Sequence, residues 1–282
     1  METDRFVNPE EDKMSQFEFG FIGCGNMGGA LAQAASKMLS ADQLAVCDAD
    51  VSKTDFLTKN KKATAASFAE VAENSRYIFL AVKPQGMRKV LEALSPVLEK
   101  RSDSFVLVSI AAGVAIDEIE EMVKLSCPVI RIMPNTPVLV EKGMTVYATN
   151  SMVTAEQEAD FLKGISAAGR FDRLPEGLID AAGAVSGCGP AFVYLFAEAL
   201  ADGGVAGGLP REKALLYAAQ TLLGAAEMIL QTGKHPGELK DAVCSPGGTT
   251  IEGVRALEEG AFRATCMNAV GAALEKTRRL KK

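Results

Sequence analysis

The sequence predicts an α/β protein in which an N-terminal, doubly wound sheet is followed by an all-helical C-terminal domain. Between Phe17 and Leu174, short β-rich runs alternate with helical stretches, which is the pattern of strands connected by helices. A glycine fingerprint joins the first run to the first helical stretch. From about Leu178 the β pattern stops and apolar residues recur at helical spacing. The two halves therefore predict two domains of different class.

The expected strands are short apolar runs bounded by turn residues. In chain order they are Phe17–Ile22, Leu44–Cys47, Tyr77–Val82, Phe105–Ile110, Val129–Met133, Met144–Ala148 and Arg170–Leu174. The expected helices lie between them at Met27–Leu39, Ser67–Asn74, Gly86–Leu98, Ile116–Lys124 and Thr154–Ala168. Because the strands are almost continuously apolar, we expect helices to cover both faces of a doubly wound parallel sheet.

The C-terminal half carries three apolar helical patterns separated by Gly- and Pro-rich turns. The patterns are formed by Phe192, Leu195, Phe196 and Leu200, by Leu215, Ala218, Leu222, Ala226 and Ile229, and by Phe262, Cys266, Val270 and Leu274. Their Ala- and Leu-rich faces offer more apolar surface than one subunit can cover, which predicts contacts between subunits. We expect a tail at residues 1–16, a sheet domain at 17–174 and a helical domain at 175–282.

Composition excludes several classes of function. The chain has 282 residues and a net charge of −6, which argues against nucleic-acid binding. The longest apolar stretch identified, Phe105–Ile116, is too short to span a bilayer. Residues 1–16 are acidic and polar without an apolar run, so we expect neither a membrane span nor a secretory signal. The six cysteines contain no C-x-x-C pair and there is a single histidine, so we expect reduced thiols in a cytoplasmic protein and no metal site.

The sharpest local signal is a G-x-G-x-x-G fingerprint after the first expected strand. It comprises Gly23, Cys24, Gly25, Asn26, Met27 and Gly28. The first glycine permits the tight turn, the second allows close approach of a pyrophosphate, and the third allows close packing of helix on strand. Free N–H groups at the helix start can bind the phosphates. We predict a Rossmann-like dinucleotide-binding domain; the alternative is a merely tight turn between strand and helix.

Asp48 ends the second expected strand. A carboxylate at that position accepts hydrogen bonds from an unmodified ribose and repels a 2′-phosphate, which favours NADH over NADPH. Lys53 is close in sequence and can offset the repulsion. The alternative role for Asp48 is that of a turn or helix-capping residue.

Further candidates for the cofactor groove follow later strands, because ligands of open α/β sheets bind beyond the carboxyl ends of the strands. They are Ser67, Ala81, Val82, Lys83, Pro84, Ala111, Ala112 and Asn135. For Lys83 the alternative is a solvated lysine at a strand end. Asn135 fits a contact with a carboxamide and an Asx turn equally well.

The C-terminal segment Pro236–Glu258 closely resembles the signature of the pyrroline-5-carboxylate reductases, which catalyse the last step of proline synthesis. Similar blocks run through the chain from about Phe17 to Arg279, at Phe21–Gly28, Phe79–Pro84, Ala111–Val114, Met133–Pro137, Val185–Ala191, Ala201–Val205 and Gly208–Pro210. The resemblance implies NAD(P)H-dependent reduction of 1-pyrroline-5-carboxylate to L-proline. It also implies a helical substrate-binding and dimerisation domain, and a homo-oligomer built from dimers.

The same resemblance marks a candidate substrate loop at Ser245, Gly247, Gly248, Thr249 and Thr250. Successive N–H groups in a glycine-containing loop before a helix can hold the carboxylate of the substrate. The Ser245 hydroxyl can donate to the same group. The resemblance places the Thr250 hydroxyl near the ring nitrogen and makes it the catalytic candidate. The alternative is a plain helix start with Ser245 as N-cap and Pro246 at the first helical position.

Two other substrate-binding candidates come from the resemblance alone. Glu176 matches a position near bound proline, although a solvated turn carboxylate is an equal alternative. His235 matches the ligand region, although a lone histidine in a Lys-His-Pro-Gly turn is more often structural. We expect Cys188 and Cys244 to be small packing residues. Ala242 replaces an asparagine found beside the cofactor in some relatives, so one polar contact is missing.

Three rival functions remain to be weighed. β-Hydroxyacid dehydrogenases share the glycine fingerprint, but they use a lysine that Pro190–Val205 lacks. A reductase of the same fold acting on another imine would use the same groups. A non-catalytic dinucleotide sensor would explain the fingerprint but leaves the Ser245–Thr250 loop without a purpose.

Overall fold

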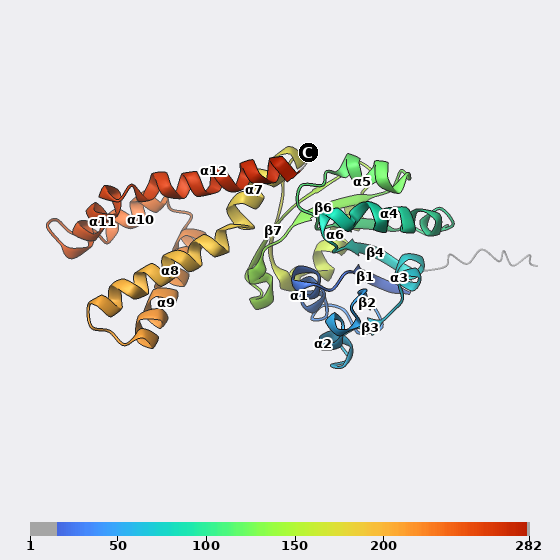
Figure 1. The fold of residues 1–282 in the computed structure, drawn as a ribbon, viewed down its shortest axis with the longest axis horizontal. Coiled ribbons are helices and arrows are strands. Elements are labelled where there is room, and N and C mark those ends of the chain that lie inside the picture. The colour runs from blue at the N-terminus through green and yellow to red at the C-terminus, as the bar shows by residue number, and fades with distance from the viewer. Residues whose placement is uncertain (1–15, 281–282) are drawn as a thin grey trace, which may run out of the picture. The chain divides into compact units, whose positions relative to one another are not determined.

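The computed structural model describes residues 16–280 (Figure 1). They form two compact units. The first comprises the residues up to Gly187 together with those from Lys276, and the second is Cys188–Glu275. The units divide beyond the boundary predicted after Leu174, because a short helix after the last strand groups with the sheet.

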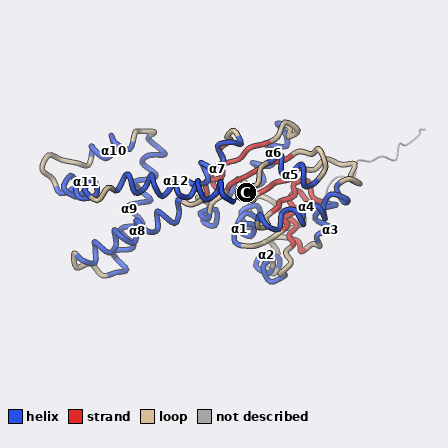
Figure 2. The backbone as a smooth tube through the Cα atoms, turned by 45° about the horizontal axis from the view of Figure 1, so that its top comes forward, coloured by secondary structure: helices blue, strands red, loops and turns tan. Residues whose placement is uncertain are grey.

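The first unit is built on one eight-stranded sheet with the strand order β3-β2-β1-β4-β5-β6-β7-β8. Figure 2 draws its strands in red. The strands are β1 (Phe17–Ile22), β2 (Leu44–Cys47), β3 (Thr64–Ala65), β4 (Ser75–Leu80), β5 (Val106–Ser109), β6 (Val129–Met133), β7 (Gly143–Thr149) and β8 (Gly169–Arg173). The doubly wound α/β class is confirmed, and the strand order reverses at β1, which pairs with both β2 and β4.

The expectation of a purely parallel sheet is wrong at one place. Strand β7 runs antiparallel to β6, whereas the other paired neighbours are parallel. The segment joining β6 to β7 holds only the 3₁₀ turn η2 (Thr136–Val140). A parallel crossover needs about a dozen residues or more, usually a helix, so this short connection reverses the chain.

The helices of the first unit are α1 (Asn26–Ala35), α2 (Asp55–Thr58), α3 (Phe68–Asn74), α4 (Pro84–Leu98), α5 (Ile116–Val123), α6 (Ala155–Gly164) and α7 (Ile179–Ser186). Three further 3₁₀ turns are η1 (Val51–Lys53), η3 (Ser166–Ala168) and η4 (Glu176–Leu178). The helix expected over Met27–Leu39 ends at Ala35, and that expected over Thr154–Ala168 ends at Gly164. Helix α2 and strand β3 were not predicted, since both are too short for a periodic pattern.

Two apolar layers sandwich the sheet. Tyr77 and Phe79 point to the layer that contains α1 and α6, and the alternating Ile78 and Leu80 point to the layer that contains α3, α4 and α5. In the first layer the rings of Phe21 and Phe79 stack with their centroids 4.1 Å apart. Each fully buried side chain of this size contributes about 1.5–3 kcal/mol. This core fixes the carboxyl ends of the strands, where the candidate cofactor loops lie.

The second unit is helical, as expected. It contains α8 (Gly189–Ala206), α9 (Arg211–Thr232), α10 (Pro236–Ala242), α11 (Thr249–Glu259) and most of α12 (Phe262–Leu280). Among the described residues its buried cluster is small and consists of Ala201, Ala214 and Ala218, with Val205 packed against it. Large apolar side chains remain exposed on α8 and α9, including Leu195, Leu216, Leu223 and Leu230.

The stretch Glu176–Ala206 is long and apolar enough to cross a membrane, by length and composition only. It was not identified from the sequence. It is not one continuous helix, because η4, α7 and α8 follow one another with a break at Gly187 and Cys188. Its low burial within one chain equally fits an apolar surface that meets a second protein chain.

Candidate active site

The glycine turn between β1 and α1 has the geometry that each of its glycines predicts. Gly23 has a φ of +99°, and a Cβ there would lie 2.5 Å from the Ala81 carbonyl oxygen. A Cβ on Gly28 would lie 2.2 Å from the Gly23 carbonyl oxygen. Gly25 has nothing within 4 Å of its Cβ position. The first and third glycines are thus required by packing, while the second leaves space for a ligand.

This turn lies at the point where the strand order reverses. Gly25 is the N-cap of α1 and no side chain caps the helix, so its first N–H groups can bind an anion. The neighbouring loop after β4 is tied to β1 by a hydrogen bond from Ala81 N to Ile22 O at 2.9 Å. The loops at Gly23–Gly28 and Ala81–Pro84 therefore share one edge of the sheet, which is the usual dinucleotide position in such folds.

Asp48 is more than a turn residue. Its Oδ2 accepts a hydrogen bond from Cys24 N at 2.7 Å, and its Oδ1 accepts one from Asp50 N at 2.9 Å. Lys53 Nζ lies 3.7 Å from Oδ1. The carboxylate thus ties the end of β2 to the glycine turn, with a cation beside it. A hollow of about 190 Å³ adjoins it and is lined by Val46, Cys47, Asp48, Val51, Thr54, Ala65 and Ala66.

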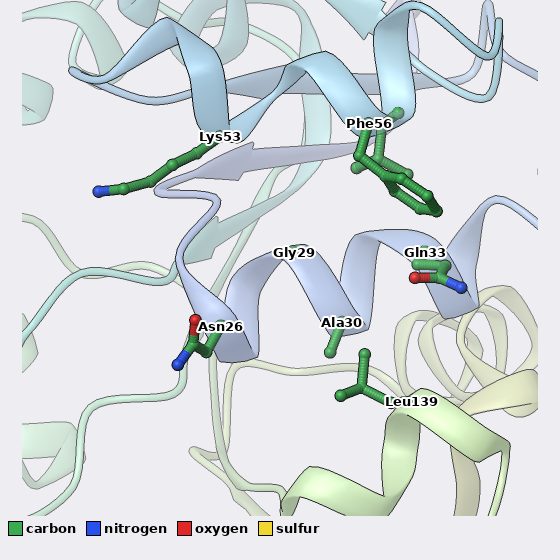
Figure 3. A pocket seen from close by; sticks show the side chains of 8 residues that line it. Asn26, Gly29, Ala30, Gln33, Lys53, Phe56 and Leu139 are labelled. Atoms are coloured by element: carbon green, nitrogen blue, oxygen red, sulfur yellow. The ribbon is translucent and has the colours of Figure 1, made fainter.

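A second hollow of about 250 Å³ runs along α1 (Figure 3). Lys53 and Phe56 lie on one side of the helix, and Leu139 lies on the other. Asn26, the first residue of α1, lines this hollow beside the glycine turn. Asn26 and Lys53 lie near the start of α1, and the apolar side chains of Phe56 and Leu139 lie farther along the helix (Figure 3).

The remaining cofactor candidates differ in how free their side chains are. Lys83 is exposed at the N-cap of α4, with Pro84 at the first helical position. Ser67 caps α3 through a reciprocal pair of bonds with Glu70. The Asn135 amide donates to Ser186 O at 2.9 Å and accepts from Met144 N at 2.8 Å. Ser67 and Asn135 thus already hold the fold together, and Asn135 does not form an Asx turn with its own segment.

The loop at Ser245–Thr250 forms a tight turn followed by a helix. Gly248 N donates to Ser245 O at 3.0 Å, and Gly247 has a φ of +65°. Pro246 and a left-handed glycine in the two central positions are typical of a type II turn. Helix α11 begins at Thr249 with Gly248 as N-cap. The alternative with Ser245 as N-cap and Pro246 at the first helical position is therefore wrong, because the turn comes first.

This arrangement leaves donors available at the start of α11. No side chain caps the helix, so the N–H groups of its first turn have no partner within the helix. Ser245, Thr249 and Thr250 are exposed. A small carboxylate fits such a set of donors, since it matches the positive end of the helix dipole and can accept several N–H and O–H bonds at once.

Two family models match the chain in separate parts. One, described as pyrroline-5-carboxylate reductase dimerisation, matches residues 176–280, and the other, described as NADP oxidoreductase coenzyme F420-dependent, matches residues 18–113. Over 268 residues the chain is 45% identical to the pyrroline-5-carboxylate reductase of Escherichia coli, covering 94% of this chain and 98% of that protein. The enzyme of Arabidopsis thaliana is 42% identical over 267 residues, covering 94% and 95%.

The chain belongs to the pyrroline-5-carboxylate reductase family. The resemblance drawn from the sequence is confirmed. Solved structures agree with it. A pyrroline carboxylate reductase of Plasmodium falciparum with NADP bound superposes with a TM-score of 0.84 at 35% identity, covering 95% of this chain and all of that one. The enzyme of Coxiella burnetii gives a TM-score of 0.86 at 31% identity, covering 95% and 99%.

Within this reductase fold, Glu176 and His235 are already engaged. Glu176 Oε1 accepts hydrogen bonds from Ile116 N at 2.8 Å and from Arg131 Nη1 at 3.1 Å. His235 is exposed and caps α10, its Nδ1 accepting from Gly237 N at 3.0 Å. Glu176 is therefore not a free turn carboxylate, and His235 has the structural role that its Lys-His-Pro-Gly turn allowed.

Sequence reasoning missed Arg131, the partner of Glu176. It is buried in the middle of β6 and also pairs with Asp180. One signal was present: a charged residue inside the otherwise apolar strand Val129–Met133 is rare unless it is paired. The partners could not be found from the sequence, since they lie on η4 and α7, far along the chain.

The cysteines do not supply a nucleophile at the nucleotide turn. All six are free thiols. Burial raises the pKa of the Cys24 thiol to about 12, and that of Cys47 to about 11. Both thiols stay protonated at neutral pH, which is the form that does not attack. Cys188 and Cys244 are partly buried, as expected of packing residues. Within residues 16–280 there is also no group of three or more residues suited to hold a metal ion.

Proposed function

We propose that the chain reduces 1-pyrroline-5-carboxylate to L-proline with a nicotinamide cofactor. The observation that carries the proposal is the substrate-type loop before α11, which lies inside the segment matched by the reductase family model. The glycine turn before α1 supports the cofactor part. The proposal does not rest on the fold alone, because the chain is similar to bacterial and plant reductases over nearly its whole length.

The residues of the second unit act by holding the substrate. The N–H groups at the start of α11 and the Ser245 hydroxyl bind the carboxylate. The Thr250 hydroxyl hydrogen-bonds the ring nitrogen and orients the imine. Gly247, Gly248 and Thr249 shape the loop around the same carboxylate, while Glu176 and His235 stay predictions as substrate contacts. Orientation is the main contribution, since a protonated imine is already electrophilic.

The bound cofactor supplies the hydride, which goes to the imine carbon, while the ring nitrogen becomes an amine. In the first unit, Gly23–Gly28 and the start of α1 bind the pyrophosphate. The backbone of Ala81–Pro84 and of Ala111–Ala112 lines the groove beyond β4 and β5. Ser67 and Asn135 stay predictions as cofactor contacts, because their side chains already bond within the fold.

We further propose a preference for NADH over NADPH. Two backbone N–H groups hold the Asp48 side chain in place, and a carboxylate there repels a 2′-phosphate. Lys53 Nζ, 3.7 Å away, reduces but does not remove this repulsion because it is also solvated. The enzyme therefore accepts both cofactors and favours the one without a phosphate.

Assembly and location follow the family. The exposed leucines of α8 and α9 lie in the segment matched by the dimerisation model, which supports a homo-oligomer built from dimers. We propose that the helical domain of 175–282 provides the dimer contacts. We also propose a cytoplasmic enzyme, since the thiols are free. The acidic net charge supports a small-molecule substrate and no nucleic-acid partner.

The test is proline formation from pyrroline-5-carboxylate with NADH and with NADPH under matched conditions. We expect turnover with both and a higher kcat/KM with NADH. Asp48→Asn can keep an oxygen for Cys24 N but loses the charge and the acceptor for Asp50 N, and it should shift the preference towards NADPH. Lys53→Met should shift it the other way. An NADPH preference of the wild type would overturn the role of Asp48. Cofactor binding without turnover would favour another imine or a sensor.

A further inference from the structure

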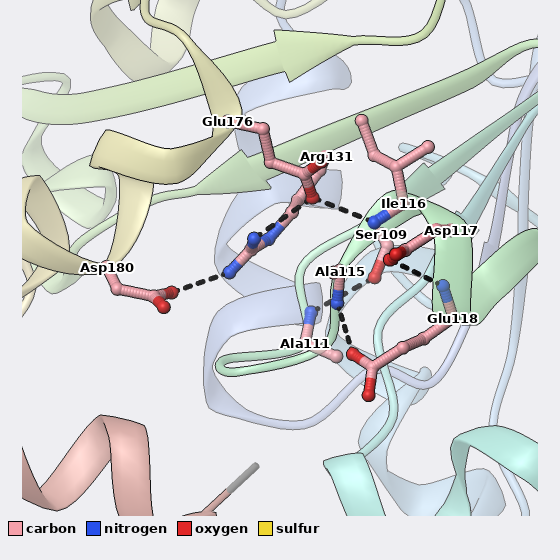
Figure 4. A network of polar contacts seen from close by, with 9 residues as sticks. All are labelled: Ser109, Ala111, Ala115, Ile116, Asp117, Glu118, Arg131, Glu176 and Asp180. Atoms are coloured by element: carbon pink, nitrogen blue, oxygen red, sulfur yellow. Dashed lines mark hydrogen bonds and ion pairs between the residues drawn. The ribbon is translucent and has the colours of Figure 1, made fainter.

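A buried arginine on one strand pairs with carboxylates on two other elements of the first unit (Figure 4). Arg131 lies on β6, and its side chain is 3% exposed. Its Nη2 donates to Asp180 Oδ1 on α7 at 2.7 Å, and its Nη1 donates to Glu176 Oε1 on η4 at 3.1 Å. A buried guanidinium is costly unless it is paired in this way, so these two carboxylates are fixed around it.

Glu176 also contacts the start of α5, so it connects Arg131 to that helix. The oxygen that pairs with Arg131 also accepts from Ile116 N, the first residue of the helix, at 2.8 Å. A carboxylate is favoured there by the positive end of the helix dipole. A second hydrogen bond at the same helix start is local: Glu118 Oε2 accepts from Ala115 N at 2.7 Å. The end of the loop before α5 is thus held by one distant and one neighbouring carboxylate (Figure 4).

The loop that these two carboxylates hold runs from Ile110 to Ala115 and follows β5. Its own hydrogen bonds are long: Ile110 N to Leu80 O is 3.4 Å, Val114 N to Ala111 O is 3.5 Å, and Ala111 N to Ser109 Oγ is 3.3 Å. Bonds of this length contribute little. The shape of the loop therefore depends on its ends. It lies beyond the carboxyl end of β5, beside the loop after β4, on the side of the sheet where the cofactor is proposed to bind.

We propose that Arg131 is a positioning residue for the cofactor. It orients Glu176, which fixes the start of α5 and so keeps the Ile110–Ala115 loop in the shape that receives the nicotinamide half of the dinucleotide. This inference rests on the proposed use of a nicotinamide cofactor and extends it to residues that do not touch the ligand. It gives Glu176 a loop-positioning role, and the predicted substrate contact of Glu176 stays a separate prediction.

The experiment measures dinucleotide binding without substrate, by the change in NADH fluorescence, so that it does not depend on which imine is reduced. Arg131→Met removes the charge but keeps most of the apolar volume. Glu176→Gln keeps an oxygen for Ile116 N and weakens the pairing with Arg131. We expect each variant to raise the Kd for NADH, Arg131→Met by about tenfold, which lies within the range of measured pairwise couplings. The double variant should bind no worse than Arg131→Met.

Arg76→Met is the matched control. Arg76 also bridges two carboxylates, at 3.1 Å from Glu18 and 2.8 Å from Asp160, but it lies on β4 at the opposite end from the cofactor loop. It should lower the thermal midpoint without changing the Kd. The proposal is overturned if Glu176→Gln and folded Arg131→Met bind NADH like the wild type. It is also overturned if the two substitutions raise the Kd independently, since they would then not act through one another. If Arg131→Met does not fold, Glu176→Gln alone decides the outcome.

Discussion

The two units of this chain bury their apolar residues to very different degrees. The sheet unit encloses two layers of aromatic and aliphatic side chains. In the described part of the helical unit, the buried cluster consists of three alanines, and large apolar side chains face outwards. A core of the first kind is stable within one chain, whereas a surface of the second kind is stable when another surface covers it. We therefore expect the sheet unit to be stable within one chain and the helical unit to need a second surface that covers its apolar side chains.

The two helix starts that bind anions in our proposal differ in what fixes the turn before them. Before α1, a Cβ at Gly23 or Gly28 would collide with backbone, while one at the N-cap Gly25 would meet nothing within 4 Å. Before α11, a Cβ at Gly247 would meet nothing within 4 Å, and one at the N-cap Gly248 would meet only atoms of its own turn, from 3.1 Å. Packing within its own unit specifies the first site. A turn and a free helix end specify the second.

The largest effect is expected from Gly28→Ala. The new Cβ would lie 2.2 Å from the Gly23 carbonyl oxygen and 2.7 Å from the Ala81 Cβ. Overpacking of this kind costs about 1–3 kcal/mol, which corresponds to a loss of up to about a hundredfold in affinity if the turn must move to bind the dinucleotide. We expect a lower thermal midpoint together with a higher Kd for NADH, measured by fluorescence.

Gly25→Ala is the control at the same turn. Its Cβ position is empty of protein atoms, so the thermal midpoint should stay unchanged. The Kd for NADH should still rise, because the methyl group stands where the pyrophosphate approaches. Normal cofactor binding by Gly25→Ala would refute the placement of the pyrophosphate at this turn.

The next largest effect is expected from a charge on the exposed apolar face of α9, which tests whether the helical unit assembles through that face. Leu216, Leu223 and Leu230 recur every seven residues along α9 and are all more than half exposed. Leu223→Asp places a charge in the middle of this row. Burying an unpaired charge costs several kcal/mol, so we expect dissociation into monomers, visible as a lower mass in light scattering, and a loss of turnover.

Leu139→Asp serves as the comparison, since Leu139 is equally exposed but belongs to the sheet unit. Its substitution should leave the oligomer mass unchanged. An unchanged mass for Leu223→Asp would mean that α9 is not an assembly surface. A mass change for Leu139→Asp alone would move the assembly surface to the first unit.

Thr250→Val should give an intermediate effect. A hydrogen bond to a charged group contributes about 1.5–3 kcal/mol, which corresponds to roughly a ten- to hundredfold loss in kcat. We expect reduced turnover at nearly unchanged Kd for NADH, from stopped-flow or steady-state assays. Thr265→Val, in which a hydroxyl on α12 loses only its bond to Ala261 O, should keep full activity. Complete inactivity of folded Thr250→Val would give the hydroxyl a larger role than orientation.

Much of the sheet unit could be predicted from the sequence because its signals are local. The runs Phe17–Ile22, Leu44–Cys47 and Val129–Met133 match the observed strands residue for residue. Apolar runs between turn residues leave few alternatives. The reversal at β7 was missed, although the connection between β6 and β7 is visibly too short for a parallel crossover, which needs about a dozen residues or more. Strand β3 could not be predicted, since its two residues carry no periodicity.

The site divides in the same way. The glycine turn could be predicted, because the G-x-G-x-x-G spacing places a glycine at each position where a side chain would collide with the fold or the ligand. The role of Glu176 could not be, since its hydrogen bonds to Ile116 and Arg131 depend on which elements meet in space. Ser67 forms a capping box with Glu70, a pattern visible in the sequence that was not used. The contacts of Arg131 join residues about fifty positions apart, and no local pattern reports them.

The smallest effect concerns alkaline pH and again separates the two units. In the sheet unit, burial raises the pKa of Cys127 from 9.0 to about 12, and those of Cys24 and Cys47 to about 12 and about 11. Above pH 9 the unfolded chain releases these protons while the folded chain keeps them. The stability that the neutral thiols provide is therefore present below pH 9 and is lost as the pH rises towards the folded-state pKa values.

Denaturant unfolding of the sheet unit, followed at pH 8 and pH 10, should accordingly show a lower free energy of unfolding at pH 10. Cys127→Ala removes one of the titrating groups and should reduce this loss by at most about 1.4 kcal/mol per pH unit, the limit for one proton. Cys266→Ala, at an exposed position of α12, should leave the pH dependence as it is. Equal slopes for Cys127→Ala and the wild type would show that the buried thiol ionises as easily in the fold as in the unfolded chain. The interior of the sheet unit would then be open to water at Cys127, just before β6, and the two units would differ less than the burial of their side chains suggests.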